Sequence, residues 1–490
     1  MAITKGLKSR TASILSNRYI SSQTLPRRSS ITSDHASSDK YPIQSIDTTT
    51  SSTMPKPSPL SILPTSSILR SLATMSISSS PILLKPSLAI MSKLAHSQSA
   101  ILSPDSNPLL RFFLKRTFYK QFCAGETEAE VKQTVDGLLN LGFSGVILAY
   151  AKEVVLDKNQ TEALASSANN EAAEACIRNE ITPWEKGVRE TILMTRAGDY
   201  AALKFTGAGS QALYDLSKQA DPSPALKEAI DSICDLAVER GVKLLFDAEQ
   251  TALQPGIDAW TLKYMEKYNK TSNGEAVIFG TYQAYLKSVP SVVAQHMEAA
   301  RKGGFTLGVK LVRGAYLGSD PRHLICDTKA DTDAAYDGIA EALVRKSYNS
   351  ILKPLSSLES NSAETPPFPS ISLVLAGHNL NSVRKVQAIC TTQKQNGEKS
   401  PDVIYAQLQG MADEVSCELV LAGKLALAKG SSDVPKAYKY LVWGTTGECM
   451  KYLHRRAQEN KDAVGRTREG RNQMAGEIWR RVKMAFGGSV

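Results

Sequence analysis

The sequence predicts an α/β protein, a (βα)8 TIM-like barrel with an N-terminal helical extension and a disordered leader. Three observations support this prediction. Eight short apolar runs recur along residues 107–490, helical patterns separate them, and polar side chains follow the ends of most runs. Runs that are apolar on both faces are typical of buried parallel strands. Eight strand–helix units in series indicate a closed barrel, with a doubly wound open sheet as the alternative.

The expected strands are rich in β-branched and aromatic residues. They are expected at 144–150, 202–207, 242–249, 276–286, 305–316, 371–379, 403–411 and 438–446. Helical periodicity separates them, as in residues 210–219, 224–241 and 291–304. The polar, proline-containing segment 356–370 is expected to be a surface insertion.

Residues 1–100 differ in composition from the rest of the chain. They carry 11 Lys and Arg against three acidic residues, contain no glutamate, and are rich in serine and threonine. Such a segment cannot bury enough apolar surface to offset chain entropy, so we expect disorder. The first 20 residues place basic side chains among apolar ones without any acid, as in a mitochondrial transit peptide. We therefore expect a leader at 1–100 that contributes nothing to catalysis and one barrel domain at 107–490.

The composition excludes several classes of protein. The chain has 490 residues, of which 42% are apolar and 22% charged, as in an ordinary globular protein. Of the net charge of +10, the leader carries +8, so the barrel does not have the charge of a nucleic-acid-binding domain. Seven scattered cysteines and six histidines show no spacing typical of a disulfide framework or metal site, so no metal is expected.

Polar side chains lie at or near the carboxyl ends of the expected strands. They are Lys204, Asp247 with Glu249, Gln283, Lys310 with Arg313, His378, Gln407 and Tyr440. The carboxyl ends of barrel strands carry the active site, so a ring of such residues indicates one. Asp247 and Glu249 could act as an acid/base pair, and one of them could also form an ion pair with Lys204.

The segment Gly207–Ala212 matches the pattern GxGxxA of a dinucleotide-binding turn. That fingerprint requires an acidic residue about 20 positions further on, at the end of the next strand. Here the next strand ends at Asp247, about twice as far away, so a loop between strand and helix is favoured.

A helical pattern follows the last strand and carries two adjacent arginines, Arg455 and Arg456. With Tyr452 they stand at positions i, i+3 and i+4, which lie on one helical face. Two arginines can bind both oxygens of a carboxylate. Because the helix follows the eighth strand, we expect this face to lie over the barrel mouth.

Six motifs together resemble those of the proline dehydrogenase family. They are FDAE (246–249), QAYLK (283–287), LVRGAY (311–316), GHN (377–379), QLQGMADEVS (407–416) and YLHRRAQEN (452–460). The resemblance covers about residues 107–490. It implies a flavin-dependent barrel enzyme that oxidises L-proline to Δ1-pyrroline-5-carboxylate. It also implies the monofunctional eukaryotic form, which lies on the matrix side of the mitochondrial inner membrane as a peripheral protein and passes electrons from FAD to ubiquinone.

The resemblance also implies roles for individual residues. Asp247 and Lys310 would be catalytic, and Lys310 with Arg313 would stabilise negative charge on the reduced flavin. The substrate would contact Lys204, Tyr316, Leu408, Tyr440, Tyr452, Arg455 and Arg456. The flavin would contact Ala248, Gln283, Lys310, Arg313, Gly314, Ala315, Gly377 and His378. Bacterial relatives often have arginine at position 310, lysine at 313 and threonine at 377, so these cofactor contacts would differ here.

Two other functions remain open from the sequence. Lys204 could be the nucleophile of a Schiff-base aldolase, with Asp247 as its acid/base partner. The barrel could also be a binding protein without catalytic activity, although the combination of Lys204, Asp247, Arg455 and Arg456 argues against this.

Overall fold

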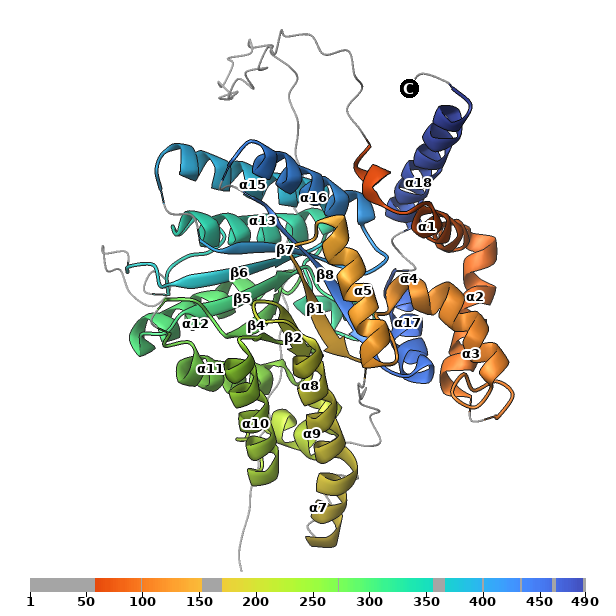
Figure 1. The fold of residues 1–490 in the computed structure, drawn as a ribbon. Helices are drawn as coiled ribbons and strands as arrows, with labels where there is room; N and C mark the ends of the chain where they lie inside the picture. Colours follow the sequence, from red (N-terminus) through yellow and green to blue (C-terminus); the bar gives the residue numbers. More distant parts are fainter. Residues whose placement is uncertain are drawn as a thin grey trace, which may run out of the picture. The chain divides into compact units, whose positions relative to one another are not determined.

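The computed structural model describes residues 58–97, 99–151, 170–271, 273–355, 366–398, 401–431, 434–460 and 464–487. Within these ranges, eight parallel strands pair in chain order, and β1 pairs with β8 to close the barrel (Figure 1). The strands are β1 (Gly145–Tyr150), β2 (Tyr200–Leu203), β3 (Lys243–Phe246), β4 (Ile278–Gln283), β5 (Leu307–Val312), β6 (Ile371–Ala376), β7 (Val403–Leu408) and β8 (Lys436–Trp443). The predicted barrel is confirmed, and the open sheet is excluded.

Helices surround the strands (Figure 1). Those that precede or follow individual strands are α5 (Glu128–Leu141), α7 (Asn170–Cys176), α8 (Thr182–Met194), α9 (Ser210–Ser217), α10 (Pro224–Arg240), α11 (Gln254–Tyr268), α12 (Val289–Gly303), α13 (Lys329–Arg345), α15 (Leu380–Gln395) and α16 (Asp413–Ala428). Short helical turns are η3 (Ile177–Ile181), η4 (Phe205–Ala208) and η5 (Arg322–Leu324). Side-chain caps fix several starts: Thr328 and Asp331 form a reciprocal capping box at α13, and the Asn379 side chain accepts backbone bonds at α15.

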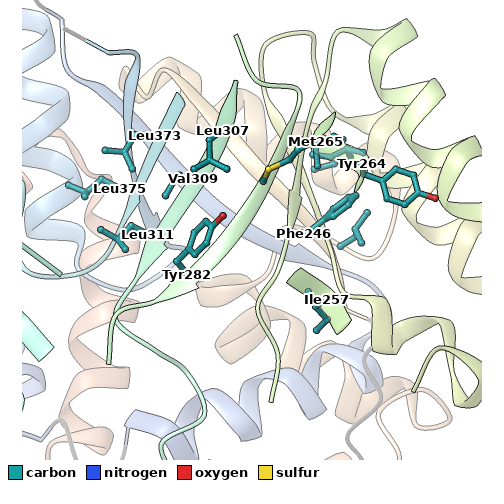
Figure 2. Close-up of a cluster of buried hydrophobic side chains, with 14 of the residues drawn as sticks. Phe246, Ile257, Tyr264, Met265, Tyr282, Leu307, Val309, Leu311, Leu373 and Leu375 are labelled. Carbon is teal, nitrogen blue, oxygen red and sulfur yellow. The ribbon is translucent and has the colours of Figure 1, made fainter. Parts of the chain in front are cut away.

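The barrel strands bury side chains on both faces, as the sequence predicts. Leu307, Val309 and Leu311 point outward from β5 and pack with Leu373 and Leu375 of β6 (Figure 2). The same outer core contains residues of β3, β4 and α11 (Figure 2). This packing joins the helical layer to the barrel.

A second core fills the barrel itself. Tyr200, Phe279 and Tyr438 meet edge to face near the amino-terminal ends of their strands, with ring centres 5.5 Å and 5.6 Å apart. Gly308 makes room for this ring cluster, since a Cβ there would lie 2.9 Å from Phe279 and 2.2 Å from the carbonyl oxygen of Ile278. Lys310 lies two positions after Gly308 on the same strand face and therefore nearer the carboxyl end. The barrel is thus closed by aromatic rings at one end and carries charge at the other.

The remaining helices pack beside the barrel near α17 (Thr446–Asn460) and α18 (Val464–Ala485) (Figure 1). They are η1 (Pro59–Ile62), α1 (Thr65–Ser78), α2 (Pro81–His96), α3 (Pro108–Leu114), η2 (Lys115–Tyr119) and α4 (Lys120–Phe122). Helix α1 packs on α18, and α2 packs on α17. No described helix combines the length and the apolar character needed to cross a membrane.

The expected disorder of residues 1–100 is wrong for residues 58–97. Leu60, Leu63 and Ile68 are buried with Cys417 and Met474 in a separate small core. The segment is stabilised by partners more than 300 positions away, which its local composition cannot reveal. Residues 1–57, which carry the predicted transit-peptide pattern, lie outside the described residues, as does 356–365 of the predicted insertion.

Candidate active site

A cavity of about 350 Å³ lies at the carboxyl ends of the barrel strands. Its walls come from strand ends, the loops that follow them, and α17. Every residue to which the resemblance assigns a role lines it: Lys204, Asp247, Ala248, Gln283, Lys310, Arg313, Gly314, Ala315, Tyr316, Gly377, His378, Leu408, Tyr440, Tyr452, Arg455 and Arg456. The volume lies within the usual range for small-molecule sites.

Four charged or polar side chains from separate strands meet at the floor of this cavity. Asp247 Oδ1 lies 2.5 Å from Lys310 Nζ, and Oδ2 lies 2.9 Å from Lys204 Nζ. The Tyr440 hydroxyl donates to Asp247 Oδ2 over 2.8 Å, and Lys310 Nζ lies 4.9 Å from the centre of the Tyr440 ring. One carboxylate therefore holds two lysines and a phenol in fixed positions.

The charges in this cluster shift one another's pKa values. Burial opposes ionisation of Asp247, but Lys204 and Lys310 outweigh it and hold the pKa of the carboxyl well below its usual range. Burial lowers the pKa of the Lys310 ammonium, and Asp247 opposes that shift. Burial, together with the Asp247 charge, raises the pKa of the Tyr440 phenol. Asp247 is therefore an anion and Tyr440 a neutral hydrogen-bond donor at neutral pH.

Helix α17 supplies the other cationic wall. It starts directly after β8, where the Thr446 backbone N–H donates to Glu126 Oε1 over 2.8 Å. Tyr452, Arg455 and Arg456 all line the cavity, as their spacing predicted. The Arg456 guanidinium carbon lies 5.7 Å from the centre of the Tyr452 ring. The cavity thus combines two adjacent arginines with a lysine–aspartate cluster.

A third group of residues lies along the β4–β6 side of the cavity. Gln283 accepts a hydrogen bond from the Ala315 backbone N–H over 3.0 Å. Arg313 is held by Asp333 (2.8 Å) and Ser382 (2.9 Å), and its guanidinium carbon lies 4.2 Å from the centre of the Tyr336 ring. Positive charge is therefore fixed at this wall as well.

The chemistry of this wall fits a cofactor that carries a hydrogen-bond acceptor or a negative charge. Arg313 Nη1 is buried, has no hydrogen-bond partner among the described residues, and belongs to a residue that lines the cavity. A buried unpaired donor is costly, so an atom of this kind indicates a missing acceptor. Gly377 lacks the Cβ that would lie 3.5 Å from that nitrogen, which leaves the space beside it open. The Leu408 backbone N–H donates to His378 Nε2 over 3.2 Å and fixes that ring at the same wall.

Glu249 does not share the site with Asp247. Its carboxylate accepts from the Thr206 backbone N–H over 3.1 Å and also bonds the Thr206 hydroxyl, and it is not among the residues that line the cavity. The two carboxylates therefore form no acid/base pair. Glu249 instead holds η4, which contains the first two residues of the GxGxxA segment. The rest of that segment is Gly209 and the first turn of α9, so it joins β2 to α9.

Sequence reasoning missed two polar residues that line the cavity, Tyr150 and Thr281, and named a third, Gln407, as a strand-end residue without a role. The Thr281 hydroxyl is buried, and no residue in the described part of the chain forms a hydrogen bond with it. Gln407 donates to the Gly377 carbonyl over 3.3 Å and accepts from Ser416 over 3.1 Å. Thr281 lies two positions before Gln283 on one strand, so strict alternation could have identified it.

The fold and the cavity define an enzyme of the (βα)8-barrel class. The model of the family "Proline dehydrogenase" matches residues 131–469. The chain therefore belongs to the proline dehydrogenase family, as the six motifs predicted.

Individual relatives agree with this assignment. A Schizosaccharomyces pombe protein named "Probable proline dehydrogenase, mitochondrial" is 29% identical over 461 residues, which cover 85% of this chain and 88% of that protein. A mouse protein named "Hydroxyproline dehydrogenase" is 28% identical over 448 residues, 85% of this chain and 92% of its own. A crystal structure of proline utilization A from Bdellovibrio bacteriovorus shares the fold, with a TM-score of 0.54 at 16% identity over 81% of this chain and 40% of that one.

Proposed function

We propose that this chain oxidises L-proline to Δ1-pyrroline-5-carboxylate, with FAD as its cofactor and ubiquinone as the electron acceptor. Membership of the proline dehydrogenase family supports the reaction. The observation that carries the proposal is a single cavity that holds the Asp247–Lys310 pair on its floor and two adjacent arginines on its wall. A small amphoteric substrate needs a cationic site for its carboxylate beside the reacting ring.

In this proposal Arg455 and Arg456 bind the carboxylate of proline, and Lys204 assists them. A cation pair in a partly closed cavity binds a carboxylate more strongly than at the surface, because the local dielectric is low. Four further side chains surround the pyrrolidine ring, namely Tyr316, Leu408, Tyr440 and Tyr452. The Tyr316 hydroxyl donates to the Ala248 carbonyl over 3.4 Å, which holds its ring beside the cavity.

The residues proposed to hold FAD are Ala248, Gln283, Lys310, Arg313, Gly314, Ala315, Gly377 and His378. FAD, when bound, supplies the two-electron acceptor for the hydride that proline loses from the carbon beside its nitrogen. Lys310 and Arg313 place positive charge at the wall where negative charge develops, and their own partners prevent them from moving away.

Proline must lose a proton from its nitrogen as well as a hydride, because an ammonium has no lone pair from which to form the imine. The pKa of Asp247 lies well below its usual range, so this carboxylate is a poor proton acceptor. Its role is to hold Lys204, Lys310 and Tyr440 in place. Exclusion of water from the cavity favours the neutral amine.

The proposed location is the matrix side of the mitochondrial inner membrane, with peripheral attachment. The transit-peptide pattern in the first 20 residues supports import. The relatives from S. pombe and Dictyostelium discoideum carry "mitochondrial" in their names.

An absorption spectrum of the purified protein tests the proposal. We expect a flavin band that L-proline bleaches in the absence of oxygen. A colourless protein that becomes covalently trapped with a carbonyl substrate by borohydride would instead support the Schiff-base aldolase. The ion pair of Lys204 with Asp247 argues against that alternative, because a nucleophilic lysine must be neutral.

A further inference from the structure

Helices α2 and α3 expose large apolar side chains toward solvent. Six of these residues define the α2–α3 face: Ile82, Leu83, Ile90, Leu109, Phe112 and Phe113. Ile82 is 84% exposed and Phe113 is 61% exposed. Several large apolar side chains exposed on two helices of a folded protein are typical of an interaction site.

The opposite sides of the same helices pack against the rest of the protein. Met91 and Ala95 of α2 and Leu110 and Leu114 of α3 pack with Leu453 of α17 in one cluster. An ordinary surface helix is polar on the side away from its core. These helices are apolar on both sides, so their second apolar side requires a partner outside the described chain.

The charge around the α2–α3 face identifies that partner. Residues 58–125 contain seven Lys and Arg, and Asp105 is the one acidic residue among them. Lys85, Lys93, Arg111 and Arg116 are exposed on or directly after these two helices. The Arg116 guanidinium carbon lies 4.3 Å from the centre of the Phe112 ring, which places cation and aromatic surface together. Apolar and aromatic side chains interspersed with basic ones match the interface of an anionic bilayer.

We propose that the α2–α3 face binds the surface of an anionic lipid bilayer. The apolar side chains enter the headgroup region, and the neighbouring lysines and arginines contact lipid phosphates. The proposal rests on the peripheral membrane attachment proposed above and names the surface responsible. It agrees with the finding that no described helix is suited to crossing a membrane.

Cosedimentation with vesicles tests this face. The full chain is mixed with vesicles of phosphatidylcholine and cardiolipin, or of phosphatidylcholine alone. We expect binding to the cardiolipin vesicles that weakens with added salt, and a loss of about tenfold or more for the double variant Phe112→Ser/Phe113→Ser. The matched control is Leu425→Ser/Leu427→Ser, which removes two exposed leucines of α16 and should bind like the parent.

Equal loss in both variants, equal binding to the two vesicles, or self-association through Phe112 and Phe113 in light scattering would overturn the proposal. Proline oxidation by the parent with a soluble dye is measured in parallel. If the parent oxidises proline but does not bind vesicles, the membrane-binding role of the α2–α3 face is refuted and the proposed reaction is not. If the parent binds vesicles through the α2–α3 face but does not oxidise proline, the proposed reaction is refuted and the membrane-binding role is not.

A separate observation concerns the inner side of α2. A second cavity, of about 150 Å³, lies between α1, α2, α17, α18 and the loop after β7. Leu84, Leu88 and Met91 of α2 form part of its mostly apolar lining. It shares His378 and Arg456 with the active-site cavity, so the two cavities meet at these side chains.

We infer that this second cavity receives the ring of a quinone. An apolar protein cavity of about this volume holds one six-membered ring such as benzene. The inference rests on the proposed proline oxidation, in which proline gives two electrons and two protons to the quinone to form pyrroline-5-carboxylate and the quinol. The second cavity lies on the inner side of α2, so a lipid-soluble electron acceptor could enter it from a bilayer bound at the α2–α3 face.

Two leucine-to-tryptophan variants test the cavity. Leu88→Trp fills it, whereas Leu69→Trp adds the same bulk at an exposed position of α1. We expect Leu88→Trp to raise the KM for a short-chain quinone about tenfold and to reduce photolabelling of α1 and α2 by an azidoquinone, while Leu69→Trp behaves like the parent. Anaerobic bleaching by proline needs no acceptor, so it should persist in both. Labelling at other sites, or equal KM values for the quinone in all three proteins, would refute quinone binding in this cavity. Absence of bleaching in the parent would refute the proposed reaction instead.

Discussion

Lys310 and Asp247 lie 63 positions apart in the chain and form a buried ion pair inside the barrel, with Nζ 2.5 Å from Oδ1. Both side chains are less than 10% exposed. Both groups have little contact with water in this position, so their charges depend on the buried partners around them. The pair therefore links the stability of the barrel to the chemistry of the cavity.

Replacement of Asp247 tests this dependence. Asp247→Asn leaves two cations at the barrel mouth without their carboxylate, and we expect it to lower the free energy of unfolding by roughly 3–5 kcal/mol. Asp247→Asn/Lys310→Met removes one of those cations and should recover part of the loss. Urea unfolding of the parent, both single variants and the double variant measures the coupling. Additive single effects would show that the two residues act independently.

Arg455→Met or Arg456→Met should lower kcat/KM for proline by about 30-fold or more. The basis is that loss of one partner from a buried charge pair costs roughly 2–5 kcal/mol, and 1.4 kcal/mol corresponds to tenfold. Oxidation of pyrrolidine, which has no carboxylate, should change little, and flavin content should remain near normal. Lys451→Met removes an exposed cation of the same helix and is the matched control. If proline and pyrrolidine oxidation fall equally, the arginines are structural.

Tyr440 should set the preference for proline over 4-hydroxyproline. Its ring lines the cavity and its hydroxyl is fixed by Asp247. The phenol leaves little space for an additional hydroxyl group. We therefore expect Tyr440→Ser to lower the ratio of kcat/KM for proline to kcat/KM for 4-hydroxyproline. Tyr440→Phe keeps the ring and should keep the preference, which separates ring volume from hydrogen bonding. Equal turnover of both substrates by the parent would refute this role.

His296 should make stability depend on pH. Its Nδ1 lies 2.8 Å from the Tyr282 hydroxyl, and burial lowers the pKa of the imidazole to about 4, against 6.5 for an ordinary histidine. The unfolded chain binds a proton that the folded chain excludes between these values. Stability from this group is therefore complete above pH 6.5 and declines as the pH falls toward 4, by roughly 3 kcal/mol. His296→Gln should remove that part of the decline in urea unfolding, and an unchanged pH profile would contradict the assignment.

Removal of N-terminal segments tests the revised boundary of the leader. A variant without residues 1–106 loses Leu60, Leu63 and Ile68, whose burial against α18 and α16 is worth about 5 kcal/mol. We expect a lower Tm for this variant, whereas a variant without residues 1–57 should melt like the parent. Location in cells should change in both if the leader directs import. An equal Tm in the two variants would show that α1 does not stabilise the barrel.

The sequence predicted all eight strands because buried parallel strands have a local signal, a short run of apolar residues. It also placed the strand-end residues other than Glu249 in one cavity, because barrel topology brings those ends together. The partners of Asp247 were harder to predict from the sequence. Lys204 was named as a possible ion-pair partner, but Lys310 and Tyr440 come next to Asp247 only when the barrel closes. The helices of residues 58–97 were missed because their apolar partners, such as Met474, lie near the other end of the chain.

The pairing of β1 with β8 has a consequence for synthesis of the protein. Residues 145–150 leave the ribosome almost 300 positions before residues 436–443, with which they form six paired positions. Until then the nascent chain carries an unpaired strand edge, which is a template for aggregation. The two arginines of α17 emerge later still, so an incomplete chain has no carboxylate-binding wall. Contacts of such long separation fold slowly, so chaperones should have a long interval in which to bind this barrel.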